Sequence, residues 1–178
     1  MTEKEIFERL LEKFKDAIGE FNEEVIQPFA TIKAAEVEKV CTYLRDNEAF
    51  EFDWLSNLSA VHYPHSEEEQ AEQKEDELEV VYHLYSFKHN HKMILKTRVP
   101  VSNPKIPSVA MLWRTADWHE REAYDLLGVE FTDHPDLRRI LLPEDWEGFP
   151  LRKDYVTPQT YNNMTVPYPE EKGDLHDE

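Results

Sequence analysis

The sequence contains a single cysteine, Cys41, in 178 residues. One thiol cannot form an intrachain disulfide, nor can it supply the thiolate cluster of an iron–sulfur or structural zinc site. Such a composition is typical of a reducing, cytosolic compartment. Position 41 falls on the apolar side of a predicted helix, so we interpret Cys41 as a small core residue.

Glycine and basic residues are also scarce. Four glycines leave no room for a P-loop or a dinucleotide fingerprint, so we expect no cofactor to bind this chain directly. Lys and Arg number 20 against 38 Asp and Glu, and the net charge of −18 argues against binding nucleic acid. We expect neither a signal peptide nor a membrane-spanning helix, so any membrane association would come through a partner.

What the chain does contain is 40% hydrophobic residues, enough for one domain with a real core. Thr2 and Glu5 have the spacing of a capping box and predict a first helix, with Gly19 placed to end it. The apolar spacing predicts a second helix over residues 34–45.

The composition of four segments predicts β-strands: residues 25–33, 52–63, 78–88 and 91–101. Pro28 in the first of these implies an edge strand or a bulge. Asn90 can form the tight turn between the last two, because asparagine tolerates left-handed geometry. Residues 64–77 are polar and strongly acidic, and we interpret them as a solvated hairpin insert.

The C-terminal half is less regular. Ser108 is placed to cap a short helix, and Asp117 to cap a second one that stops at Gly128. We also predict short strands over residues 129–131 and 138–142. After these, five prolines and scattered aromatic residues show no periodicity, which favours an extended arm that is laid on another surface.

Residues 118–155 alternate charges of both signs with apolar residues. Such a segment is neither a plain amphipathic helix nor a solvated linker, and we expect it to pair its charges or dock on another surface. Its most suggestive catalytic motif runs from His119 to Ala123. A zinc peptidase helix needs a second histidine at position 123, so a metal hydrolase that uses His119 and Glu120 would lack a ligand.

Two other chemical interpretations remain open for this segment. The carboxylates of Glu120, Glu122 and Asp125 could act with Arg121 in general acid–base catalysis, but most such clusters are structural ion pairs. The pairs Arg138-Arg139 and Arg152-Lys153 could hold an anion. In so acidic a segment, we expect them to pair with carboxylates of this chain or of a partner.

Three linked motifs carry a family resemblance: Trp118-His-Glu-Arg-Glu-Ala-Tyr-Asp-Leu-Leu-Gly, His134-Pro-Asp-Leu-Arg-Arg-Ile-Leu and Asp145-Trp-Glu-Gly-Phe-Pro-Leu-Arg-Lys-Asp-Tyr. With Phe52-Asp-Trp-Leu-Ser-Asn-Leu upstream, they resemble the thirty-kilodalton subunit family of respiratory complex I, which in bacteria is the C subunit of the NADH–quinone oxidoreductase. The resemblance covers about residues 34–157. The sequence departs from it at Phe149, where many relatives have His, and in its longer acidic insert.

The resemblance implies an α+β fold, a two-layer domain with a mixed β-sheet packed by helices over residues 1–142, and an extended C-terminal arm over residues 143–178. It implies a non-catalytic structural core subunit in the hydrophilic arm of a proton-translocating NADH:quinone oxidoreductase (complex I). Such a chain packs beside the forty-nine-kilodalton-type D subunit and the B subunit and supports the quinone-reducing module. FMN, iron–sulfur clusters and quinone would belong to neighbouring subunits, with no cofactor or metal in this chain.

The resemblance also implies a peripheral place on the cytoplasmic side of the cell inner membrane. The alternative is the equivalent subunit of a membrane-bound hydrogenase or a ferredoxin-driven complex, since nothing in the sequence identifies the electron donor. We expect subunit-interface residues along the charged segment: Glu120, Arg121, Glu122, Tyr124, Asp125, His134, Asp136, Arg138, Arg139, Trp146, Arg152, Lys153, Asp154 and Tyr155. We further expect residues 1–142 to fold without the arm.

Overall fold

The computed structural model describes residues 1–66 and 74–166. Within them a five-stranded sheet has the order β1-β2-β5-β4-β3. Its strands are β1 (Ile18–Asn22), β2 (Phe29–Ile32), β3 (Trp54–Tyr63), β4 (Glu77–Ser86) and β5 (His91–Pro100). The pairing of β2 with β5 is parallel and the other pairings are antiparallel. The predicted α+β class with a mixed sheet is therefore confirmed.

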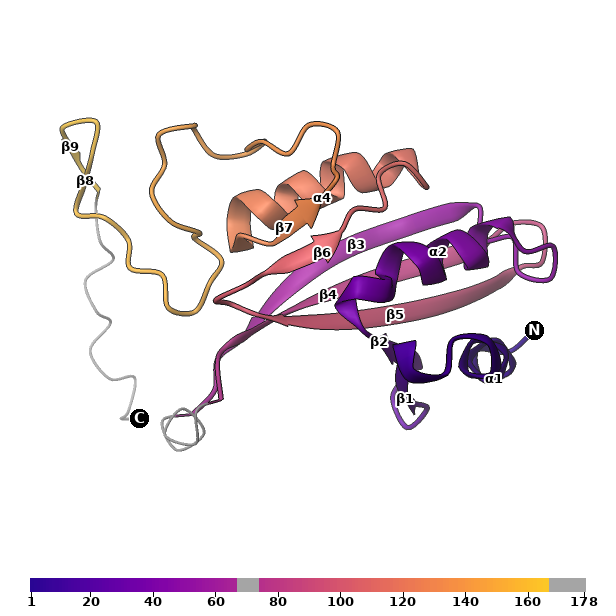
Figure 1. The fold of residues 1–178 in the computed structure, drawn as a ribbon. Coiled ribbons are helices and arrows are strands. Elements are labelled where there is room, and N and C mark those ends of the chain that lie inside the picture. The colour runs from indigo at the N-terminus through magenta and orange to yellow at the C-terminus, as the bar shows by residue number, and fades with distance from the viewer. Residues whose placement is uncertain (67–73, 167–178) are drawn as a thin grey trace, which may run out of the picture.

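Helices α1 (Glu3–Phe14), α2 (Val37–Asp46) and α4 (Arg114–Leu127) accompany this sheet. The predicted capping box is present, because the Glu5 amide donates to Thr2 Oγ1 at 3.3 Å and the Thr2 amide donates to Glu5 Oε2 at 2.9 Å. Figure 1 shows α2 and α4 on the same side of the long strands β3, β4 and β5. The molecule thus has the predicted two layers.

The core forms where the alternating side chains of the strands meet the apolar stripes of the helices. Strands β4 and β5 contribute Leu78, Val80, Tyr82, Leu84, Met93, Leu95 and Val99, and the helices contribute Ile6, Leu10, Val37, Val40, Cys41 and Leu44. Cys41 is fully buried, as predicted, and burial raises the pKa of its thiol well above the ordinary value.

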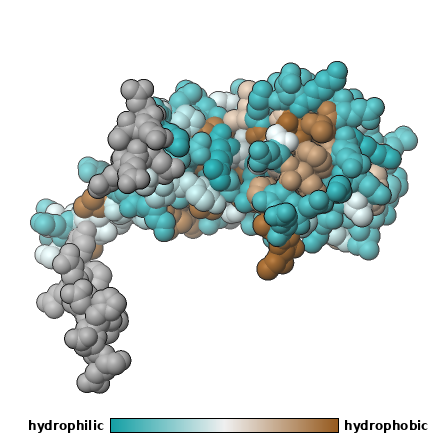
Figure 2. Space-filling model, turned by 90° about the horizontal axis from the view of Figure 1, so that it is seen from below, coloured by the Kyte–Doolittle hydropathy of each residue, from teal (hydrophilic) through white to brown (hydrophobic). Residues whose placement is uncertain are grey.

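The opposite face of the sheet is less covered. It bears a hollow of about 770 Å³, whose apolar walls include Val61, Val81 and Ile94. Figure 2 shows hydrophobic side chains gathered on the molecule seen from below. Alternate residues of one strand therefore serve different environments, which is the direct result of the two-residue period of a strand.

Two expectations for the N-terminal region are wrong. Helix α1 ends at Phe14, and Gly19 lies in β1, where a side chain would collide with Thr31 of the neighbouring strand. Strand β1 was not predicted, because its sequence contains glycine and polar residues. It pairs with the outer side of β2, which makes β2 internal to the sheet despite Pro28.

The short helix predicted after Ser108 is absent, because residues 110–112 form a turn. Helix α4 begins at Arg114, so Asp117 lies in its first turn and does not cap it. Ser108 caps no helix, because its hydroxyl donates to Glu120 and accepts from the Ala110 amide. The helix begins after Trp113, whose indole Nε1 donates to the Phe52 carbonyl at 2.9 Å and ties the helix start to the domain. Gly128 ends α4 as predicted, with a left-handed φ of 79°.

The connections on either side of α4 form a two-stranded parallel sheet from β6 (Lys105–Pro107) and β7 (Glu130–Thr132). Strand β7 was predicted, whereas β6 falls where prolines suggested a break. The strand predicted over residues 138–142 is absent, because its amides bind a side chain instead of a neighbouring strand. The C-terminal arm contains a small hairpin, β8 (Thr160–Tyr161) and β9 (Met164–Thr165), which was not predicted.

The acidic insert connects the paired strands β3 and β4, so its position in a hairpin is confirmed. Residues 67–73 of the insert lie outside the described residues. At its C-terminal end, the Asp76 carboxylate accepts from the His65 amide and the Asp76 carbonyl accepts from the Val101 amide, which attaches this end to the domain. A search of the described helices finds none with the length and apolarity needed to cross a membrane.

Candidate functional site

The polar residues of α4 bind the irregular segment that follows β7. Asp125 is fully buried, and its Oδ2 accepts from the amides of Ile140, Leu141 and Leu142 at 3.0, 2.7 and 2.9 Å. Its Oδ1 accepts from Arg139 Nη1 at 2.8 Å. One carboxylate therefore holds three consecutive amides that would otherwise need a strand partner.

Arg139 extends this attachment to the next turn of chain. Its Nη2 donates to the carbonyls of Trp146 and Gly148 at 3.0 and 3.2 Å, while its Nη1 also reaches the Asp125 carbonyl. Burial by itself raises the pKa of Asp125, but the hydrogen bonds from the Leu142 amide and from Arg139 outweigh it and leave that pKa below its usual range. The carboxylate is thus ionised and structural.

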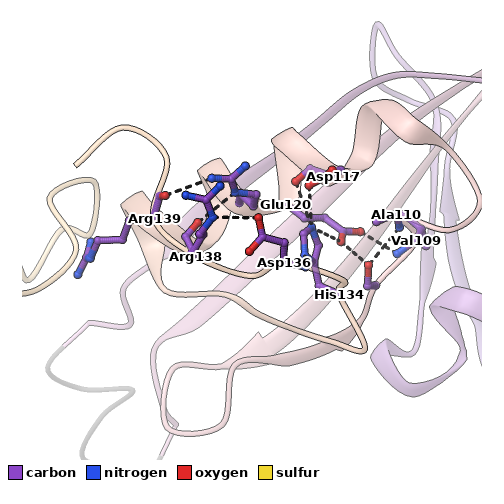
Figure 3. A network of polar contacts seen from close by, with 10 residues as sticks. Val109, Ala110, Asp117, Glu120, His134, Asp136, Arg138 and Arg139 are labelled. Carbon is purple, nitrogen blue, oxygen red and sulfur yellow. Dashed lines mark hydrogen bonds and ion pairs between the residues drawn. The ribbon is translucent and has the colours of Figure 1, made fainter. Parts of the chain in front are cut away.

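Arg121 binds the same segment one turn earlier on α4. Its Nε donates to the Arg138 carbonyl at 3.2 Å, and its Nη2 donates to the Arg139 carbonyl at 3.3 Å. The Arg138 side chain instead pairs with Asp136 at 2.9 Å on the exposed surface, as Figure 3 shows. The adjacent Arg138 and Arg139 therefore have different roles, and both pair with a carboxylate of this chain, as expected.

Glu120 faces the interior on the other side of α4. Its Oε2 accepts from Ser108 Oγ at 2.5 Å, and its Oε1 accepts from the Val109 amide at 2.7 Å. Burial raises the pKa of Glu120 to about 7, although these two hydrogen bonds lower it, and the Asp117 carboxylate adds to the rise. This carboxylate connects α4 to the turn that precedes it.

His134 closes this cluster from the segment after β7 (Figure 3). Its Nδ1 accepts from the Asp136 amide at 3.0 Å, which leaves the ring hydrogen on Nε2, and Nε2 donates to the Asp117 carbonyl at 3.1 Å. The same nitrogen lies 3.8 Å from Glu120 Oε2. The histidine thus positions the chain against α4, and both ring nitrogens are occupied.

The arm covers the C-terminal end of α4. The Leu151 amide donates to the Leu126 carbonyl at 3.1 Å, and Arg152 Nε donates to the Leu127 carbonyl at 2.6 Å. These two carbonyls belong to the last turn of the helix, where backbone acceptors lack helical partners. Phe149 lies beneath Arg152, with 4.5 Å between the guanidinium carbon and the ring centroid. The arm therefore completes the cap of α4.

The arm also reaches the sheet domain directly. The Lys153 amide donates to His62 Nδ1, on β3, at 2.9 Å. His62 is almost fully buried, and its Nε2 lies 3.5 Å from Asp76 Oδ2. Arm, insert and sheet meet at this histidine, which the sequence did not single out because a lone histidine in a strand carries no motif.

The structure divides the expected interface residues into an internal group and an exposed group. Glu120, Arg121 and Asp125 are buried, and Tyr124, His134, Arg139, Trp146, Arg152 and Tyr155 are partly buried. The exposed members are Glu122, Asp136, Arg138, Lys153 and Asp154. Most of the internal group binds other parts of the domain, and Arg139 and Arg152 attach the arm to it. The exposed group faces solvent.

The residues of the incomplete zinc motif do not converge. Glu120 points into the core, whereas His119 and Glu122 line surface hollows on the outer side of α4. A search of the described residues for three or more metal-ligating side chains finds no cluster. Glu120, Glu122 and Asp125 also face different surroundings, so they do not form one acid–base set.

Comparison with known proteins shows which family the sequence of this chain matches. The sequence profile described as "Respiratory-chain NADH dehydrogenase, 30 Kd subunit" matches residues 30–161. The C subunit of the NADH-quinone oxidoreductase of Chlorobium phaeobacteroides is 43% identical over 159 residues, which cover 88% of this chain and 90% of the relative. The corresponding protein of Chloroherpeton thalassium is 41% identical over 159 residues, but this chain covers only 62% of its length.

Two solved structures have a fold similar to that of this chain. A trypsin-resistant fragment, residues 1–134, of Nqo5 is 28% identical, with a TM-score of 0.55 over 73% of this chain and 98% of the fragment. A chain of the membrane-bound sulfane sulfur reductase, an archaeal respiratory membrane complex, has a TM-score of 0.66 at 24% identity, over 86% of this chain and 85% of that chain. The latter similarity shows a shared fold. The chain belongs to the thirty-kilodalton subunit family of the respiratory-chain NADH dehydrogenase.

Proposed function

We propose that this chain is a non-catalytic structural core subunit in the hydrophilic arm of a proton-translocating NADH:quinone oxidoreductase. It packs beside the forty-nine-kilodalton-type D subunit and the B subunit and thereby supports the quinone-reducing module. The observation that carries the proposal is the family match over residues 30–161, which includes the sheet domain from β2 onward and most of the described arm.

The geometry of α4 supports a structural role. Its buried polar side chains each bind backbone groups of the same chain: Glu120 binds the turn before the helix, and Arg121 and Asp125 bind the segment after it. Such contacts hold an irregular surface in one conformation. Preorganised surfaces of this kind bind partners with less loss of conformational entropy.

We further propose that FMN, iron–sulfur clusters and quinone belong to neighbouring subunits, and that this chain binds no metal or cofactor. The single thiol is buried in the core, and the incomplete His-Glu motif is divided between the core and the surface. The chain would then lie on the cytoplasmic side of the cell inner membrane and contact the membrane only through its partners.

An alternative function is the equivalent subunit of a related membrane complex. The fold is shared with a chain of a sulfane sulfur reductase, so the fold alone does not specify the electron donor. A membrane-bound hydrogenase or a ferredoxin-driven complex would be other assemblies of this kind.

The test is affinity purification of the tagged full chain from gently solubilised membranes. We expect a forty-nine-kilodalton-type subunit, bound FMN and NADH:quinone oxidoreductase activity to co-purify with it. A nickel–iron centre in the large neighbour, without NADH oxidation, would instead support the alternative. A chain that purifies without any other subunit would contradict both functions.

A further inference from the structure

The outer side of α4 bears an apolar surface that the internal polar network leaves exposed. We call it the Trp118 surface, and its residues are Trp118, His119, Glu122, Ile140 and Leu141. Trp118 and Leu141 have 67% and 61% of their surface exposed. Together these residues line a hollow of about 380 Å³, which is large enough to receive a side chain of another protein.

A second hollow of about 230 Å³ lies on the other side of His119 and Glu122. Its walls come from β3, α4 and the arm, and they include Leu58, Leu126 and Leu151. His119 and Glu122 therefore form a ridge between two hollows that are mostly apolar. Hollows beside an exposed tryptophan are typical of the centre of a protein interface.

The exposed leucine of this surface is held rigidly. The Leu141 amide donates to the buried carboxylate of Asp125 at 2.7 Å, and the amides on either side bind the same oxygen. A leucine on an irregular segment would normally gain stability by turning inward. Here the backbone attachment keeps it on the surface, beside the indole.

The charge of the surface indicates what it binds. Among the residues that line the two hollows, the acidic or basic side chains are those of Glu122 and His119. Within the described part of the chain, its carboxylate has no ion-pair partner. A partner that covered the apolar walls would desolvate this carboxylate, which requires an opposite charge close by.

We propose that the Trp118 surface receives an apolar side chain flanked by a lysine or arginine from a neighbouring subunit of the respiratory complex. The apolar side chain enters a hollow beside Trp118 and Leu141, and the cation pairs with Glu122. This proposal rests on the proposed function and specifies which part of α4 makes the contact.

The test is carried out on the full chain in its native complex. The photoreactive residue p-benzoylphenylalanine replaces Trp118 in one strain and Phe87 in another. Phe87 is a matched control, because it is also aromatic and 65% exposed but lies on the β4–β5 turn. We expect position 118 to crosslink to a co-purifying subunit at a peptide with Lys or Arg within about one helical turn of an apolar residue.

Two substitutions measure the contribution of the surface. We expect Trp118→Ser and Glu122→Lys each to lower the fraction of chain in the complex by at least about tenfold, as for a central interface residue. Phe87→Ser and Glu12→Lys, the latter at an exposed position of α1, should leave that fraction unchanged. Circular dichroism of each purified chain confirms that it is folded.

The outcomes are distinguishable. A crosslink from position 118 to a second copy of this chain, or no crosslink together with normal assembly of Trp118→Ser and Glu122→Lys, would overturn the proposal. In either case the wild-type chain would still co-purify with the NADH:quinone oxidoreductase, so the proposed function would stand. If the wild-type chain joined no complex, the proposed function itself would fail.

Discussion

Replacing Asp125 with asparagine tests whether one buried carboxylate holds the segment between β7 and the arm. Asparagine has nearly the same shape, and its carbonyl oxygen can still accept from the amides of Ile140, Leu141 and Leu142. The substitution removes the negative charge and puts an amide group, a hydrogen-bond donor, opposite the guanidinium of Arg139. It therefore changes the electrostatics of the site with little change in volume.

The magnitude follows from burial and partners. Asp125 is 0% exposed and the Arg139 side chain 16% exposed, so solvent screens their 2.8 Å ion pair weakly. Breaking a buried pair by removing one charge costs about 3–5 kcal/mol. Arg139 keeps the carbonyls of Trp146 and Gly148 as acceptors, which offsets part of that loss. We therefore expect Asp125→Asn to lower the free energy of unfolding by about 3 kcal/mol.

The pH dependence has a definite sign. The hydrogen bonds of the folded chain lower the pKa of Asp125, so the ionised carboxylate stabilises the folded state above the unfolded pKa of about 3.9. This contribution is lost as the pH falls through the lower folded pKa. The difference between wild type and Asp125→Asn should stay constant from about pH 5 to 8 and shrink below about pH 4.

The assay is urea denaturation of the full chain, followed by circular dichroism at several pH values. For a chain of this size we expect a Tm lower by roughly 6–12 °C as well. Asp136→Asn is the control, because this exposed carboxylate of the same segment pairs with Arg138 in solvent and should contribute little to stability. A loss for Asp125→Asn no larger than that of the control, or a difference that does not change with pH, would refute the reasoning.

Three further predictions concern the other attachments. Because burial raises the pKa of Glu120 to about 7, the folded chain binds more protons than the unfolded one between about pH 4.3 and 7. The free energy of unfolding of the wild-type chain should therefore fall as the pH rises through that window. Urea titrations of Glu120→Gln at several pH values should show no such fall. If the fall persisted in that variant, it would come from other titratable groups. Arg152→Glu removes the donor to the Leu127 carbonyl and puts a negative charge at the C-terminal end of α4, so it should cost about 2 kcal/mol. Lys153→Glu is the control at the next, exposed residue and should cost less than about 0.5 kcal/mol. Equal melting temperatures for Arg152→Glu and Lys153→Glu would contradict a capping role for Arg152. Deleting residues 67–73 keeps Asp76 and its bonds to His65 and Val101, so folding and assembly should persist, since loop closure changes by less than about 1 kcal/mol. Loss of assembly in this deletion would identify the insert as a docking element.

Local patterns predicted most of the sheet and the helices. The capping box of Thr2 and Glu5, the alternation in β4 and β5, and the left-handed Asn90 all depend on residues close together in the chain. Strand β1 was missed because its polar residues are stabilised by pairing with β2, a contact between separate segments. The start of α4 was predicted at the wrong residue, because Trp113 fixes it by binding the distant Phe52 carbonyl.

The charged segment shows the same division at the level of function. Its sequence by itself determined that many charges would be paired, that Gly128 would end the helix and that the chain belongs with this family of respiratory-chain subunits. Only the tertiary structure decided that Arg121 and Asp125 turn inward while Glu122, on the same helix, faces outward. The reason is physical: a side chain's charge is encoded locally, but whether it is satisfied within the chain depends on which backbone groups the fold brings within hydrogen-bond distance.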